Sequence, residues 1–193
     1  MRIVSGKYGG RKLSVPKGND IRPTSDKIRG AVFNILRSRG TLEGTVVIDA
    51  FCGTGALGLE ALSQGASSCS FIDKNKDSLN LAKQNVEAFG VEDEARFILK
   101  DSTKLGPRPA DMPLVTLAFL DPPYNQTLVT PTLAALHEGG WLAGEALLVL
   151  EVEKSFNESL PTPFKVLDER NYGGTTILLA GYEAIDEAEQ ENA

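Results

Sequence analysis

The chain has 193 residues, of which 41% are hydrophobic and 24% charged, a composition typical of one soluble globular domain. No apolar run approaches the roughly 20 residues that a membrane-spanning helix needs, and the first residues lack the apolar stretch of a signal peptide. We therefore expect a cytoplasmic protein. Cys52 and Cys69 are too few for a disulfide framework and lack the spacing of metal ligands, so we expect two buried, reduced thiols.

The charge is distributed unevenly along the chain. Residues 1–40 contain ten basic and two acidic side chains, a net charge of +8, whereas the remainder carries −14. A basic segment on an acidic body is typical of polyanion binding, although a solvated basic face has the same composition. We expect three regions: a basic hairpin and helix extension over 1–40, a main domain over 41–183, and an acidic, disordered tail over 184–193.

The N-terminal elements are short. Residues 1–20 combine glycines with basic residues and predict a small hairpin or an ordered arm. Thr24 or Ser25 can cap a helix that starts near Asp26, continues with apolar residues at helical spacing and ends at Gly40. The basic residues of this helix lie off its apolar stripe, which predicts an exposed basic face. They are Lys27, Arg29, Arg37 and Arg39.

From about residue 44 onward, apolar runs that suit buried strands alternate with helical periods. This alternation predicts a Rossmann-like α/β fold, a mostly parallel sheet with helices on both faces. Two further strands, joined through a glycine-rich connection at 171–174, predict a terminal antiparallel hairpin and a total of seven strands. The expected strands are 46–48, 69–72, 97–99, 114–120, 146–152, 164–167 and 175–182, and the expected helices are 56–62, 79–89 and 128–136.

The first strand-to-helix turn reads Asp49-Ala50-Phe51-Cys52-Gly53-Thr54-Gly55-Ala56-Leu57-Gly58. Gly53 and Gly55 let the backbone approach a ligand, and Gly58 allows the helix to pack closely on the strand. The acid before the glycines disfavours a pyrophosphate, which needs N–H donors and no nearby carboxylate. It suits a cationic ligand with an amino group and a sulfonium, such as S-adenosylmethionine.

Acidic residues also follow the next three strands. Asp73 ends the second, where a carboxylate can accept both hydroxyls of a ribose, and Asp101 follows the third, where it can read an adenine edge. The fourth strand is stopped by prolines in Asp121-Pro122-Pro123-Tyr124. Here the carboxylate and a proline carbonyl can accept N–H bonds from an exocyclic amino group, and the ring can stack on a base. Carboxyl ends of parallel strands share one rim, so we expect a single site.

The glycine turn and the Asp-Pro-Pro-Tyr sequence together resemble class I S-adenosylmethionine-dependent methyltransferases that act on an exocyclic base nitrogen. Over nearly its whole length, the chain is similar to the bacterial family of small-subunit ribosomal RNA guanine-N2 methyltransferases D. The segments that carry this likeness are Gly9-Gly10-Arg11-Lys12-Leu13, Arg22-Pro23-Thr24-x-Asp26-x-x-Arg29, Phe33-Asn34, the turn from Asp49 to Glu60, Asp121–Tyr124 and Gly140-Trp141-Leu142.

The resemblance implies a cofactor site, a catalytic motif and an RNA-binding extension over 1–40, without a metal. The cofactor-binding residues would be Asp49, Phe51, Cys52, Gly53, Thr54, Gly55, Asp73, Lys74, Asp101 and Ser102. The catalytic residues would be Asp121, Pro122, Pro123 and Tyr124. The RNA-contacting residues would be Arg11, Lys12, Arg22, Thr24 and Arg29.

The implied reaction is methyl transfer from S-adenosylmethionine to the exocyclic N2 of one guanine in 16S ribosomal RNA, leaving S-adenosylhomocysteine. The substrate would be the small ribosomal subunit or an assembly intermediate, and the enzyme a monomer. Two alternatives remain open. Because the motif also suits the amino group of adenine, the protein could be an adenine-N6 methyltransferase acting on DNA or RNA. A cofactor-binding ribosome-assembly factor without catalysis is the other alternative, and the intact acid and aromatic ring argue against it.

Overall fold

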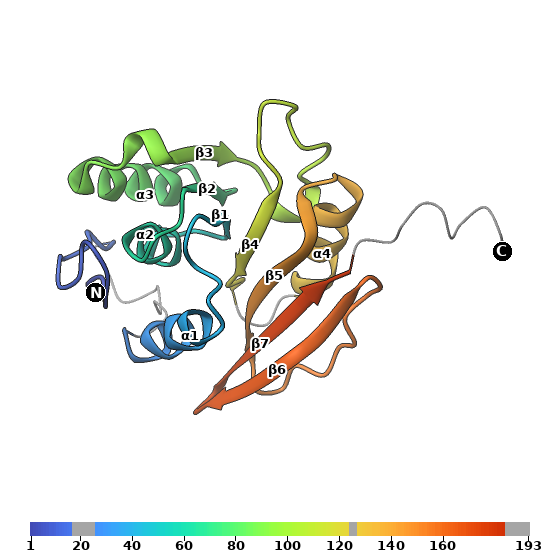
Figure 1. Ribbon diagram of the computed structural model, residues 1–193. Coiled ribbons are helices and arrows are strands. Elements are labelled where there is room, and N and C mark those ends of the chain that lie inside the picture. Colours follow the sequence, from blue (N-terminus) through green and yellow to red (C-terminus); the bar gives the residue numbers. More distant parts are fainter. Residues whose placement is uncertain (17–25, 124–126, 184–193) are drawn as a thin grey trace, which may run out of the picture.

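The computed structural model of the protein describes residues 1–16, 26–123 and 127–183 (Figure 1). Its centre is a seven-stranded sheet with the order β3-β2-β1-β4-β5-β7-β6. Strands β1 to β5 pair in parallel, whereas β7 runs antiparallel to both β5 and β6. The expected mostly parallel, Rossmann-like sheet with a terminal antiparallel hairpin is confirmed.

Most elements lie where the periodicity placed them. The strands are β1 (Val46–Ala50), β2 (Ser68–Asp73), β3 (Ala95–Leu99), β4 (Val115–Leu120), β5 (Leu142–Glu153), β6 (Phe164–Tyr172) and β7 (Thr175–Tyr182). The helices are α1 (Asp26–Ser38), α2 (Ala56–Ser63), α3 (Lys76–Phe89) and α4 (Val129–Glu138), with short 3-10 turns η1 (Glu92–Glu94) and η2 (Ser102–Lys104). None of the helices in the described parts of the chain is both long and apolar enough to cross a membrane.

The sheet is covered on both faces, as expected for parallel strands (Figure 1). Helices α1, α2 and α3 pack on one face with Val47, Leu117 and Val149, and α4 packs on the other with Ile48 and Leu148. Successive residues of a strand therefore belong to opposite cores, which is the period-two alternation of a pleated strand. This alternation decides on which side each rim residue projects.

Local sequence explains the ends of α3. The side chain of Asn75 accepts hydrogen bonds from the amides of Asp77 (2.8 Å) and Ser78 (3.2 Å), and Gly90 closes the helix with a left-handed φ of 68°. The expected end at Gly90 is thus confirmed. The predicted caps of the N-terminal helix, Thr24 and Ser25, lie outside the described residues.

The N-terminal arm, residues 1–16, is built into the main core. An antiparallel bridge joins Arg2 to Lys12, which confirms the expected hairpin-like arm. The apolar side chains of Ile3, Tyr8 and Leu13 are buried in the same core as α1, α2 and α3. The arm therefore has a fixed position on the helical face of the sheet.

Two strands, β5 and β6, are each five residues longer than expected. β5 begins at Leu142, and β6 extends through a charged stretch to Tyr172. β6 is the edge strand of the sheet, and its side chains between Lys165 and Asn171 are mostly exposed. An exposed edge strand needs no apolar alternation, so its length is set by pairing with β7, which the local pattern cannot show.

Candidate active site

The strand order brings the glycine turn and the Asp-Pro-Pro sequence to one rim of the sheet. β1 lies between β2 and β4. From β1 the chain continues outward to β2 and β3 on one side and then to β4 and β5 on the other, and sheets of this type bind ligands at this switch point. The register pairs Asp49 with Phe119 and Ala50 with Leu120, so the chain leaves β1 and β4 side by side. Asp73 ends the other neighbour, β2, so Asp49, Asp73 and Asp121 share one rim. The negative charges of Asp121 and Asp73 both contribute to raising the pKa of Asp49.

The backbone of the glycine turn is tightly curled. Phe51, Gly53 and Gly55 all have positive φ values, of 64°, 52° and 76°. Two hydrogen bonds hold this shape, from Cys52 N to Ile72 O at 3.0 Å and from Gly55 N to Cys52 O at 2.7 Å. A positive φ is costly for a phenylalanine, on the order of 1–3 kcal/mol, and such strain is concentrated at functional sites.

Asp49 is buried at the base of this turn, with 1% of its surface exposed. Its Oδ2 accepts a hydrogen bond of 2.9 Å from the amide of Gly58 in α2. Burial raises the pKa of Asp49 well above its ordinary value, and the hydrogen bond from Gly58 lowers it in part. A cation bound at the rim would favour the ionised form of this carboxyl group, which is the electrostatic match that a sulfonium and an ammonium offer.

Asp73 fastens the end of β2 to the glycine turn. Its Oδ2 accepts from Gly53 N at 3.1 Å, and its Oδ1 accepts from Asn75 N at 2.8 Å. The carboxylate is half-buried and retains lone pairs for a ligand, whereas the next residue, Lys74, is exposed. Asp73 thus lies at the end of β2, as expected, and its role as the ribose acceptor stays a prediction.

The end of β3 contains an unpaired buried hydroxyl. Asp101 accepts from the Thr103 hydroxyl at 2.7 Å and from the Thr103 amide at 3.0 Å, and these bonds lower the pKa of Asp101. Ser102 is 2% exposed, and its Oγ has no hydrogen-bond partner in the described structure. Buried polar atoms are nearly always paired, so a polar group of a ligand is the natural partner. The residues present therefore fit S-adenosylmethionine at this rim.

Two of the predicted cofactor-binding side chains are directed into the protein, one with a hydrogen bond and one by burial. The Thr54 hydroxyl donates to Met1 Sδ at 3.5 Å, and the thiol of Cys52 is buried, which raises its pKa. These residues can offer their backbone to a ligand. Asn85 fixes the same turn, because its Nδ2 donates to the carbonyls of Thr54 (2.9 Å) and Ser14 (3.0 Å). Asn85 was not predicted from the sequence. The available signal was a polar residue among the apolar positions that α3 buries.

The Asp-Pro-Pro sequence continues directly from β4. Pro122 is buried and Pro123 exposed, while the predicted stacking residue Tyr124 lies outside the described residues. A cavity of about 270 Å³, the rim cavity, lies beside the prolines. Its lining includes Pro122, Pro123, Val129, Glu151, Val152 and Phe156. Glu151 is 6% exposed and was not predicted. The available signal was an acid in the apolar run of β5, near its carboxyl end.

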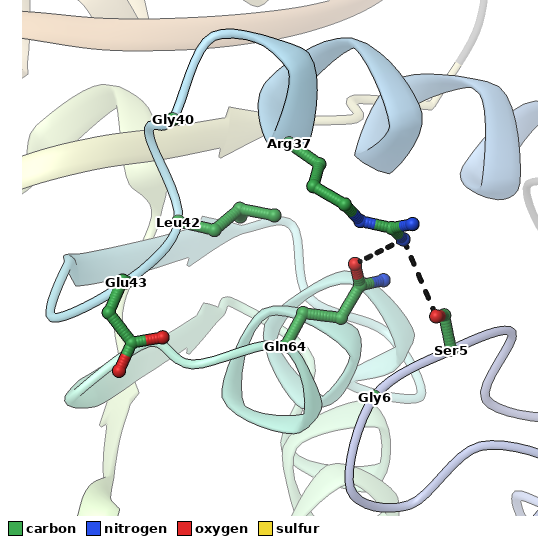
Figure 2. A pocket seen from close by; sticks show the side chains of 7 residues that line it. All are labelled: Ser5, Gly6, Arg37, Gly40, Leu42, Glu43 and Gln64. Atoms are coloured by element: carbon green, nitrogen blue, oxygen red, sulfur yellow. Dashed lines mark hydrogen bonds between the residues drawn. The ribbon is translucent and has the colours of Figure 1, made fainter.

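A second cavity of about 280 Å³ lies near the amino end of β1 (Figure 2). It opens between the N-terminal arm, the end of α1, the segment before β1 and the end of α2. Figure 2 shows Arg37 reaching across it to Gln64 at 2.9 Å and Ser5 at 3.4 Å. None of its lining residues is a predicted cofactor or catalytic residue, so the rim remains the candidate active site.

The predicted RNA-contacting residues divide into three groups. Lys12 is exposed, as is Arg11, whose guanidinium lies 4.2 Å from the centre of the Phe89 ring and donates to carbonyl groups at the end of α3. Arg22 and Thr24 lie outside the described residues. The prediction for Arg29 is wrong.

The side chain of Arg29 is wholly buried and forms ion pairs with Asp26 at 2.9 Å and Glu60 at 3.2 Å. It cannot reach RNA in this conformation, and it does not belong to an exposed basic face. Lys27, Arg37 and Arg39 are exposed, as expected. The spacing along α1 placed Arg29 off the apolar stripe, but α2 and the arm cover that side of the helix.

The described residues contain no group of three or more histidine, cysteine, aspartate or glutamate side chains that could hold a metal ion.

The fold and the rim define the class of protein. A mostly parallel seven-stranded sheet that ends in an antiparallel hairpin, with a glycine turn after β1 and Asp-Pro-Pro after β4, is the Rossmann-like fold of class I methyltransferases. The chain belongs to the ribosomal RNA small subunit methyltransferase D family, whose family model, described as "Conserved hypothetical protein 95", matches residues 1–181.

Relatives cover most of the chain. It is 32% identical over 174 residues to Ribosomal RNA small subunit methyltransferase D of Haemophilus influenzae, an alignment that spans 90% of this chain and 89% of the relative. The protein of the same name from Escherichia coli K12 is 32% identical over 84% of this chain and 78% of its own length. The solved structure of Escherichia coli yhhF superposes with a TM-score of 0.82 at 29% identity, covering 96% and 99% of the two chains.

Proposed function

We propose that the protein transfers a methyl group from S-adenosylmethionine to the exocyclic N2 of one guanine in 16S ribosomal RNA. The observation that carries this proposal is the shared rim, on which the charge of Asp121 raises the pKa of Asp49. A cofactor turn and an amino-group motif thus lie within electrostatic reach of each other. The names of the relatives support ribosomal RNA of the small subunit as the substrate.

The cofactor would lie over the carboxyl ends of β1, β2 and β3. Asp73 would accept the ribose hydroxyls, and the Ser102 hydroxyl would meet the adenine side. Asp49 would stabilise the cationic end through its charge, because only 1% of its surface is exposed. When bound, S-adenosylmethionine supplies a methyl group on a cationic sulfur, from which an amine lone pair can displace it.

The lone pair of guanine N2 is delocalised into the ring, so the protein must orient it. Asp121 and the carbonyl of Pro122 can accept the two N–H bonds of the amino group and turn the lone pair out of the ring plane. Such positioning accounts for most of the expected rate gain. Asp121 can also take the proton that the nitrogen loses, a contribution of about 10²–10⁴ in rate.

The target base must leave its stack to reach the rim. We propose that Tyr124 stacks on it, which offsets about 1–3 kcal/mol of the unstacking free energy. The basic arm would hold phosphates, with Lys12 exposed for this purpose. The protein would bind an extended RNA surface as a monomer in the cytoplasm.

The test is methyl transfer to small subunits purified from cells that lack the protein, followed by nucleoside analysis. Wild-type protein should form N2-methylguanosine. Asp121→Ala should lose activity by about 10³-fold or more yet bind S-adenosylmethionine in a calorimetric titration. The exposed Asp111→Ala variant is the matched control and should retain activity. Formation of N6-methyladenosine would favour adenine as the target, and a wild-type protein that binds cofactor without transferring methyl would favour an assembly factor.

A further inference from the structure

Glu151 is a buried carboxylate at the methylation rim. It lies near the carboxyl end of β5, is 6% exposed, and stands between two core residues, Leu150 and Val152. Burying an ionisable side chain inside an apolar strand is unfavourable unless polar partners compensate, so such residues are rare. The reaction described above does not use this group.

The strand register places Glu151 beside Asp121. β4 and β5 are parallel neighbours, and their last registered pair is Leu120 with Leu150. Asp121 follows the end of β4 directly, and Glu151 is the next residue of β5, so their backbones lie at the same level, about 5 Å apart. Phe119 and Val149, two residues earlier, both belong to the core under α1, α2 and α3, the face on which Asp49 accepts a hydrogen bond from Gly58 of α2. By the same alternation, Asp121 and Glu151 project toward that face.

Glu151 also borders the space that a base would enter. It lines the rim cavity together with Pro123 and with Pro122, whose carbonyl is proposed to accept from the amino group. β4 lies between β1 and β5 in the sheet. A base whose exocyclic nitrogen lies at Asp121 would therefore turn its neighbouring ring nitrogen toward either β1 or β5. The cofactor turn occupies the β1 side, which leaves the β5 side, where Glu151 lies.

The chemistry of the two candidate bases differs at that ring nitrogen. In guanine the N2 amino group adjoins N1–H, so the edge presents neighbouring donors that suit a carboxylate. In adenine the N6 amino group adjoins N1, which is an acceptor and is repelled by a carboxylate. A nearly dry carboxylate discriminates strongly, because it accepts the N1–H of one base and repels the N1 lone pair of the other.

We propose that Glu151 is the specificity-determining residue that accepts the N1–H of the target guanine and excludes adenine. This inference rests on the proposed function of the same rim. It assigns the choice of base to β5, whereas the Asp-Pro-Pro sequence recognises only an amino group. Glu151 also interacts within the protein, so its test must separate base recognition from a structural role.

The experiment uses small subunits reconstituted with 16S ribosomal RNA that carries either guanine or 2-aminopurine at the target position. 2-Aminopurine keeps the 2-amino group but has an acceptor at N1. Wild-type protein should prefer guanine in kcat/KM by about 100-fold or more. In Glu151→Gln the amide can donate to N1 of 2-aminopurine, so this preference should fall at least tenfold. Glu151→Asp, which keeps the acceptor, should retain the preference at a lower rate.

Glu145→Gln is the matched control, because it makes the same substitution at an exposed position near the amino end of β5, away from the rim. It should leave both the rate and the preference unchanged. An unchanged preference in Glu151→Gln would overturn the assignment, even if both rates fell together, since a structural role lowers them equally. If wild-type protein methylated neither substrate while binding cofactor, the proposed function would fail first and this assignment with it.

Discussion

Arg29 of α1 and Glu60 of α2 form a wholly buried ion pair, with Arg29 Nε donating to Glu60 Oε2 at 3.2 Å. The same carboxylate accepts the amides of Val4 at 2.7 Å and Ser5 at 2.9 Å, and the side chain of Gln64 at 2.7 Å. One glutamate therefore joins the N-terminal arm, α1 and α2. The basic extension is held in place by this carboxylate, which belongs to the helix that follows the cofactor turn.

Removing the Glu60 carboxylate should destabilise the protein strongly. Glu60→Ala removes the buried ion-pair partner of Arg29, which keeps only the half-exposed Asp26, and leaves two arm amides without acceptors. This loss should lower the free energy of unfolding by about 3–5 kcal/mol in urea denaturation. If this variant does not fold, Glu60→Gln provides a milder loss. The exposed pair of Arg96 and Asp111, at 2.7 Å, is the control, and Arg96→Ala should lose less than about 1 kcal/mol. Equal losses at both pairs would refute the role of burial.

Helix α2 approaches the sheet too closely for any side chain at Gly58. A Cβ added there would lie 2.4 Å from Phe71 Cε1 and 2.6 Å from Cys69 Sγ. Gly58→Ala should therefore lower the free energy of unfolding by about 1–3 kcal/mol. The same clash should displace the Gly58 amide, which donates to Asp49, and should therefore weaken cofactor binding. Gly174→Ala, where nothing lies within 4 Å of the new Cβ, should change neither quantity measurably.

The stability of the protein should depend on pH through Asp49. Burial raises its pKa above the ordinary 3.8, so the folded state binds this proton more tightly than the unfolded state. Its contribution to stability is full below the unfolded pKa and is lost as the pH rises through the raised folded pKa. Asp49→Asn lacks this loss, so its unfolding free energy relative to wild type should increase with pH between pH 4 and neutrality. Chemical denaturation across this range measures the difference.

A matched control separates Asp49 from the other acids. The exposed Asp93→Asn variant makes the same substitution away from the rim and is measured in parallel, and the pH dependence of Asp49→Asn should exceed that of this control. A constant difference for Asp49→Asn would mean that this carboxyl group titrates as it does in the unfolded chain. The same variant should bind S-adenosylmethionine more weakly, since it removes a negative charge from the rim.

Binding to ribosomal RNA should depend on salt through the exposed basic residues of the arm. Replacing Arg2 or Lys12 by alanine should make the slope of log affinity against log salt concentration shallower by about 0.7–0.9 for each phosphate that the variant no longer neutralises. Filter binding or fluorescence anisotropy across several salt concentrations measures the slope. Lys165→Ala, on the exposed edge strand β6, should leave it unchanged. Equal effects at all three positions would mean that the arm does not bind the RNA.

The positions of residues that depend only on nearby sequence could be predicted. The strand-end acids Asp49, Asp73 and Asp121 follow apolar runs, and parallel topology requires such ends to share a rim. The strand order β2-β1-β4, with parallel pairing, brings these three strand ends together. Gly53 and Gly55 were predicted to lie in a turn where the backbone can approach a ligand, and in the structure both have a positive φ.

Roles that depend on distant partners could not be predicted. Arg29 looked like a surface cation because its partner Glu60 lies 31 residues away and the arm folds back over both. Glu151 looked like one residue of an ordinary strand, since its proximity to Asp121 follows from the register of β4 and β5. Both residues are buried ionisable side chains, and their roles depend on which elements pack beside them in the fold.

The most direct measurement of the central claim is mass spectrometry of ribosomal RNA nucleosides from cells without the gene, complemented with wild-type or Asp121→Ala protein. We expect the deletion to remove one N2-methylguanosine from 16S ribosomal RNA, and wild-type protein but not Asp121→Ala to restore it. An unchanged N2-methylguanosine content after deletion, or full restoration by Asp121→Ala, would contradict the claim that this rim presents a guanine amino group to a methyl donor.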